Sequence, residues 1–139
     1  MRNTVAHRIG VASSAIGIAA ASMMFSSSTA SAATYSCPVD YVCVYDNDAF
    51  AGHVYAFPAA NGYYEPNLNM DPPKWLSGVY LNDHISSIIN NTRHTASFHK
   101  DANYKGGRTV IPPKSWNSKL STTGFDNSIS SFSVDISGT

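Results

Sequence analysis

The chain has 139 residues, of which 43% are hydrophobic, with nine basic and nine acidic side chains. This length suits one compact domain and is too short for two ordinary ones. No cluster of Lys and Arg could follow a phosphate backbone, so nucleic acid is not expected as a partner.

The N-terminal segment has the features of a secretory signal. The basic opening MRNTVAHR precedes the apolar run IGVASSAIGIAAASMMF, and ASA at 30–32 supplies a small-x-small cleavage pattern. We therefore predict a signal peptide over residues 1–32 and a secreted domain over residues 33–139. The cleaved domain would keep seven basic residues against nine acidic ones. It has no second apolar run of membrane-spanning length, so no membrane association is expected after cleavage.

Both cysteines lie in the stretch CPVDYVC. In a secreted chain, Cys37 and Cys43 are expected to oxidise to one disulfide. So short a ring would stabilise the fold by roughly 2 kcal/mol, through the entropy it removes from the unfolded chain. A metal site built on this pair is less favoured, because a four-coordinate site needs further ligands and the sequence has no other cysteine.

The remaining sequence is typical of an all-β domain. Helical periodicity is nearly absent, while Tyr, Val, Phe, Ile, Ser and Thr alternate in short runs that Gly, Pro, Asn and Asp interrupt. Six runs have the length and composition of strands. They are YVCVYD (41–46), GHVYAF (52–57), SSIINN (86–91), TASFHK (95–100), GRTVIP (107–112) and SSFSVDI (130–136).

The runs form an internal repeat. Segments 44–57 and 97–112 share a strand, a polar turn, an aromatic residue and a glycine, and each is followed by a serine motif, NDHISS at 82–87 and DNSISS at 126–131. The first unit is longer, and its extra residues fall within Pro58–Tyr80. Several prolines in that segment predict a long loop and not additional strands.

The repeat resembles a known fold family. Tyr45-x4-Phe50-x-Gly52 is similar to the aromatic-x4-aromatic-x-Gly signature of βγ-crystallin Greek keys, in which the glycine supplies a positive φ at a folded hairpin. The second copy has histidine in the first position, as His99-x4-Tyr104-x-Gly106. The resemblance implies an all-β, βγ-crystallin-like sandwich of two Greek keys, over about residues 36–91 and 92–136.

The serine motifs resemble the N/D-N/D-x-x-S/T-S calcium motif of the same family. Calcium takes six to eight oxygen ligands, which Asn, Asp, Ser and main-chain carbonyls can supply. The resemblance implies two calcium sites that exchange ligands between the motifs, with dissociation constants on the order of 10⁻⁵ to 10⁻³ M. The residues implied are Asn82, Asp83, the carbonyl of His84, Ser86, Asp126, Asn127, the carbonyl of Ser128, Ser130, and the hairpin carbonyls of Asp46 and Lys100. The alternative is that these side chains only hold tight turns.

The CPxxxxC segment leading into the first key resembles peptidase inhibitor family I36. That resemblance implies inhibition of an extracellular metalloproteinase by an exposed loop. Aromatic and apolar anchors dominate binding hot spots, and the long first loop offers Tyr63, Tyr64, Trp75 and Leu76. The alternative is that these side chains cover the core or simply decorate a long loop.

An enzyme is not expected, because the sequence has no H-E-x-x-H, G-x-S-x-G or P-loop string. A monomeric binding protein is the preferred interpretation. The alternatives are a calcium-stabilised structural or cell-envelope module, or a killer-toxin-like protein, without inhibitor activity.

Overall fold

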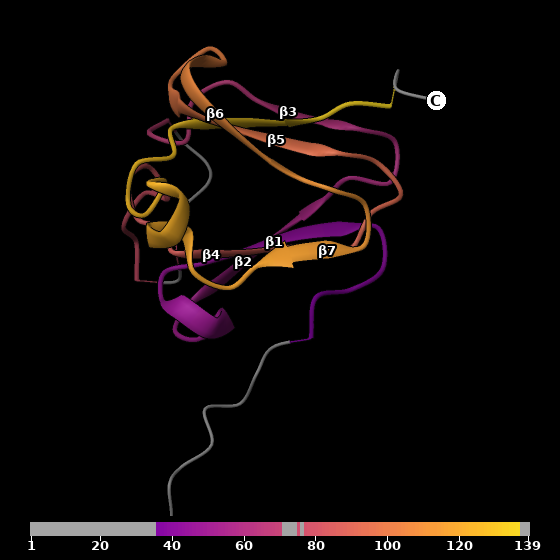
Figure 1. Ribbon diagram of the computed structural model, residues 1–139, viewed down its shortest axis with the longest axis horizontal. Coiled ribbons are helices and arrows are strands. Elements are labelled where there is room, and N and C mark those ends of the chain that lie inside the picture. Colours follow the sequence, from indigo (N-terminus) through magenta and orange to yellow (C-terminus); the bar gives the residue numbers. More distant parts are fainter. Residues whose placement is uncertain (1–35, 71–74, 76, 137–139) are drawn as a thin grey trace, which may run out of the picture.

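The computed structural model describes residues 36–70, 75 and 77–136. Two four-stranded antiparallel sheets lie one above the other (Figure 1), and the fold class predicted from the sequence is confirmed. The first sheet has the order β2 (Val54–Pro58), β1 (Tyr41–Tyr45), β4 (Ser87–Asn90), β7 (Ser115–Asn117). The second has the order β3 (Tyr63–Glu65), β8 (Ser131–Val134), β5 (Ala96–Asp101), β6 (Lys105–Ile111).

The two sheets have equivalent strand orders. In each half of the chain the first, second and fourth strands stay together, and the third strand joins the sheet of the other half. Two 3₁₀-helices, η1 (Asp48–Phe50) and η2 (Leu120–Thr123), complete the described elements. No helix in the described residues is long and apolar enough to cross a membrane. Because each half supplies an edge strand to the other, neither half can form its full sheet alone.

The prediction that residues 58–80 form only a loop is wrong, because β3 lies within this segment. The strand β7 was also not predicted. Each has three residues, so neither shows a period-two pattern long enough to read from sequence. Tyr63 pairs with Val134 and Glu65 with Phe132, so tertiary pairing to β8 defines β3.

The core between the sheets is centred on aromatic rings. Phe132 is fully buried, with its ring centroid 4.6 Å from Phe57, 5.1 Å from Phe98 and 5.4 Å from Tyr63. Such offset and edge contacts add to the free energy gained by burying the rings. These residues come from strands of both sheets and both halves, so this cluster fastens the sandwich together.

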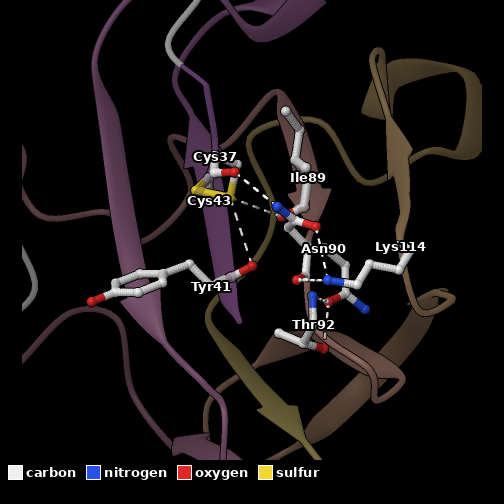
Figure 2. The surroundings of a disulfide bond; sticks show 8 residues. Cys37, Tyr41, Cys43, Ile89, Asn90, Thr92 and Lys114 are labelled. Atoms are coloured by element: carbon white, nitrogen blue, oxygen red, sulfur yellow. Dashed lines mark hydrogen bonds between the residues drawn. A yellow bond between two sulfur atoms is a disulfide. The ribbon is translucent and has the colours of Figure 1, made fainter. Parts of the chain in front are cut away.

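A second apolar cluster lies around the predicted disulfide, which is present between Cys37 and Cys43. Cys43 and Tyr45 are fully buried there, beneath partly buried side chains that include Ile89 of β4. Figure 2 shows the disulfide beside Ile89 and the polar groups that follow it. The cluster covers the outer side of the first sheet, so both sides of that sheet carry apolar contacts.

Asn90, at the end of β4, is the centre of a buried polar network, of which Figure 2 draws the contacts with Thr92. Its Nδ2 lies 2.8 Å from the carbonyl oxygen of His94, and 3.0 Å from those of Ile111 and Pro112. Its Oδ1 accepts from the amide of Thr92 at 3.1 Å and from its hydroxyl at 2.7 Å. A fully hydrogen-bonded amide is tolerated in a core. The side chain of Asn90 thus holds the segment that joins the two halves of the chain next to the end of β6.

Candidate functional site

Each half carries a folded hairpin with a ring contact, although histidine replaces the first aromatic residue in the second half. The ring centroids of Tyr45 and Phe50 lie 5.7 Å apart, and those of His99 and Tyr104 lie 6.0 Å apart, so histidine keeps the packing that tyrosine provides in the first half. Gly52 has φ +80°, and a Cβ at that position would collide with the side chain of Asp46. The glycine is therefore required both by backbone conformation and by space.

The last serine of each motif closes its hairpin. The Ser87 hydroxyl donates to the carbonyl of Asn47 at 2.6 Å and accepts from the amide of Phe50 at 3.0 Å. The Ser131 hydroxyl donates to the carbonyl of Asp101 at 2.6 Å and accepts from the amide of Tyr104 at 3.0 Å. The serines at the sixth position of each motif, Ser87 and Ser131, thus hold the turns. The serines implied as calcium ligands are those at the fifth position, Ser86 and Ser130.

The structure brings the two motifs together across the pseudo-twofold axis. The amide of Asp83 donates to the carbonyl of Ile129 at 3.0 Å, and the amide of Asn127 donates to the carbonyl of Ile85 at 3.1 Å. The Ser130 hydroxyl lies 3.5 Å from Oδ1 of Asp83, so side chains of the two motifs meet directly. Asp83 and Asn127 have φ of +55° and +48°, a left-handed conformation that Asp and Asn tolerate best among side-chain-bearing residues.

The fifth-position serines lie beside the hairpins that were expected to supply carbonyls. The amide of Ser86 donates to the carbonyl of Tyr45 at 2.8 Å, next to Asp46. The amide of Ser130 donates to the carbonyl of His99 at 2.9 Å, next to Lys100. The backbone of each fifth-position serine is therefore close in space to one hairpin, although the two are far apart in the sequence.

The side chains at positions one and two have opposite chemistry in the two motifs. In the first motif, the side-chain Nδ2 of Asn82 donates to Oδ2 of Asp83 at 2.7 Å. The other carboxylate oxygen of Asp83, Oδ1, faces Ser130. In the second motif, the side-chain Nδ2 of Asn127 donates to Oδ2 of Asp126 at 3.3 Å. The side-chain oxygen of Asn127 takes no part in that contact. One motif thus presents a carboxylate oxygen, and the other presents a neutral oxygen.

The side chains of other residues in the implied calcium sites differ in their hydrogen bonding. The carboxylate of Asp46 accepts from the backbone amide of His53 at 2.7 Å and lies 2.7 Å from its Nδ1, so this side chain holds the hairpin. The ring of His84 bonds through Nδ1 to the carbonyl of Asn82 at 2.6 Å. Oδ1 of Asp126 and Oγ of Ser128 are buried oxygens without a hydrogen-bond partner in the described residues. In those residues no group of three or more His, Cys, Asp and Glu side chains is placed to hold a metal ion.

Of the proposed inhibitory residues, the three that the structure describes do not share one exposed surface. Tyr64 is 59% exposed on β3, whereas Tyr63 packs on Phe57 and Phe132, and Trp75 is only 4% exposed within the main core. Leu76 lies outside the described residues. Trp75 is therefore part of the core, and Tyr63 packs against it. The exposed Met70, at 63%, was not identified from the sequence, since an isolated methionine in a loop carries no pattern.

Burial perturbs the ionisable groups around β3. The pKa of Tyr63 is raised to about 12, first by burial and then by the nearby carboxylate of Glu65. Burial also raises the pKa of Glu65, although the amide of Asn67 and the hydroxyl of Tyr63 partly oppose that shift. In the second hairpin, burial and then the charge of Arg108 lower the pKa of His99, which favours its neutral form.

The sandwich of two interlocked four-stranded halves is the fold of βγ-crystallin domains, and solved structures agree. One, described in terms of the evolution of the eye lens βγ-crystallin domain fold, is 22% identical with a TM-score of 0.61, covering 73% of this chain and 91% of that one. A βγ-crystallin domain from Flavobacterium johnsoniae is 31% identical with a TM-score of 0.52, covering 70% and 97%. A βγ-crystallin from an archaeon is 28% identical with a TM-score of 0.51, covering 70% and 100%.

The family model of peptidase inhibitor family I36 matches residues 30–111. The match spans more than half of the chain, so the chain belongs to that family. No curated protein matches the sequence significantly.

Proposed function

We propose that this chain is a secreted, monomeric calcium-binding protein with two interlocked sites. The observation that carries the proposal is the meeting of the two motifs, with the Ser130 hydroxyl 3.5 Å from Oδ1 of Asp83. The donors there are carboxylate, amide, hydroxyl and main-chain oxygens, which suit a hard cation. Calcium bound at the sites would lower the cost of the buried Asp126 and Ser128 oxygens if it lay within their reach.

The residues fall into two donor sets. Asp83 and Ser130 would act with the carbonyls of Ser128 and Lys100, and Asn127 and Ser86 would act with those of His84 and Asp46. Bound calcium would supply charge that links the two motifs, so its effect is on stability and not on catalysis. Because a bound ion stabilises only the folded state, calcium at 100 times its dissociation constant adds about 2.7 kcal/mol per independent site.

Calorimetric titration of the chain with calcium is expected to fit two sites. Ser86→Ala and Ser130→Ala should each remove one binding event, because each deletes one hydroxyl ligand while leaving the sixth-position serines to close the hairpins. Ser133→Ala on the same strand as Ser131 is the matched control and should titrate as the wild type does. A titration without heat at millimolar calcium would refute the proposal.

Asn127→Asp is expected to tighten calcium binding at the site that contains Asn127 by about tenfold, or ~1.4 kcal/mol, since ligand charge sets calcium affinity. Asp83→Asn, the reverse change in the other motif, should weaken its site by a similar factor. The two variants separate the effect of charge from that of shape, because Asn and Asp side chains have nearly the same shape. One variant adds a negative charge at a ligand position, and the other removes one. Equal affinities in both variants and the wild type would show that neither side chain is a ligand.

Family membership supports a second function, inhibition of an extracellular metalloproteinase. Tyr64 lies at the middle of β3 and exposes its ring. The residues on either side of it, Tyr63 and Glu65, are partly buried, and Tyr63 stacks on Phe132. The segment is therefore already ordered before binding. Such pre-organisation reduces the entropy lost on association.

Titration of a thermolysin-type metalloproteinase with the chain tests this second function. Inhibition should weaken by about tenfold or more in Tyr64→Ala, which truncates an exposed aromatic anchor. Trp116→Ala is the matched control, since Trp116 is 63% exposed at the middle of β7, the equivalent edge strand of the other sheet. Equal inhibition by both variants would exclude β3 as the contact, and no inhibition by the wild type would exclude the function against this enzyme class.

A further inference from the structure

The strand β6 differs from its counterpart β2 in exposure. Both are edge strands of their sheets. In β2 the side chains Val54, Tyr55 and Ala56 are partly buried and Phe57 is buried. In β6 the first four residues, Lys105 to Arg108, and Val110 are exposed. In the described residues β6 pairs only with β5, so its outer edge has no neighbouring strand, although the carbonyl of Ile111 at its end accepts a hydrogen bond from Asn90.

Charge is also divided unequally between the halves. Of the seven basic residues after residue 32, six lie between Arg93 and Lys119, and six of the nine acidic residues lie between Asp40 and Asp83. The strand β6 carries Lys105 and Arg108, both exposed. Asp101, the one acidic residue on β5, pairs with Lys105, and its carboxylate lies against Gly106, so the two basic side chains of β6 outnumber the acidic one.

We propose that the outer edge of β6 binds an acidic polypeptide segment in extended conformation, as an added strand of the second sheet. An unpaired edge supplies main-chain hydrogen bonds to an incoming strand, and alternate side chains then set its specificity. Here Arg108 and Lys105 select acidic side chains, and the exposed Val110 offers an apolar contact at 39% exposure.

A second copy of the chain is a poorer occupant of this edge. Pairing two β6 strands would bring Lys105 and Arg108 of one copy against those of the other, and like charges placed opposite each other on paired strands are destabilising. Basic residues on an edge strand also protect proteins from edge-to-edge association. The same charges that oppose self-pairing favour an acidic strand.

The test uses a fluorescent seven-residue peptide of alternating Glu and Val, measured by anisotropy and by the amide NMR shifts of the full domain. We expect binding that weakens with salt, with the largest shifts in β6. Arg108→Glu should weaken binding by about fivefold or more, because it reverses a charge at the edge. Arg93→Glu is the control, since it makes the same charge change at an exposed position in the turn before β5.

A second peptide separates strand addition from charge attraction. N-methylation of alternate residues removes backbone donors and keeps the charges, so it should abolish binding to a sheet edge. Equal weakening by Arg108→Glu and Arg93→Glu, or undiminished binding of the methylated peptide, would show a non-specific charge effect and overturn the proposal. The absence of binding, or self-association of the chain through β6, would also overturn it.

Discussion

Asn90→Asp is expected to destabilise the domain by about 3–5 kcal/mol at neutral pH, the usual cost of a buried charge without a partner. The substitution keeps the size of the side chain but places an oxygen where Nδ2 now faces three carbonyl oxygens. The free energy of unfolding, measured by urea denaturation, should fall accordingly, and the melting temperature by about 10 °C or more.

The loss should depend on pH. Burial raises the folded-state pKa of the new carboxyl above its unfolded value of about 3.9. The penalty is therefore complete above the folded pKa and shrinks as the pH falls toward the unfolded value, where the carboxyl is protonated in both states. Asn61→Asp, at an exposed position, is the control and should change stability by less than about 0.5 kcal/mol. Equal effects of the two variants would contradict the network.

Phe132→Ala is expected to cost about 3–5 kcal/mol, because it removes a fully buried ring and leaves a cavity. The ring lies against Phe57, Phe98 and Tyr63, so the loss would loosen contacts between the two sheets. Urea denaturation of the calcium-free chain measures this cost without a contribution from bound ions.

The exposed Trp116 gives the matched control for Phe132. Trp116→Ala removes a larger ring but should change the free energy of unfolding by no more than about 0.5 kcal/mol. Phe132→Leu keeps part of the buried volume and should fall between the two. A loss below about 1 kcal/mol for Phe132→Ala would mean that this aromatic cluster is not the centre of the core.

The sequence allowed the fold to be predicted where a local physical requirement left a signature. Gly52 and Gly106 both have the positive φ that a folded hairpin demands, and the first hairpin has the ring pair that its aromatic residues predicted. Cys37 and Cys43 were close enough in a short segment to predict their disulfide. The strands β1, β2, β4, β5, β6 and β8 each overlap a predicted run.

Features that depend on tertiary contacts could not be predicted. The third strand of each half joins the other sheet, so β3 and β7 are defined by partners distant in sequence. Trp75 and Tyr64 are both aromatic residues of the segment expected to be a loop, yet one is buried in the core and the other is exposed. The contact between Asp83 and Ser130 joins residues 47 positions apart. The repeated motif indicated both residues, but only the fold brings them together.

The most direct test of the central proposal is calorimetric melting of residues 33–139 in EDTA and in millimolar calcium. Two sites that bind only the folded state predict a melting temperature several degrees higher in calcium, with the rise reduced in Ser86→Ala and Ser130→Ala. A melting temperature that calcium does not change would contradict the proposal. The serine motifs would then serve only to hold the two hairpins closed through Ser87 and Ser131.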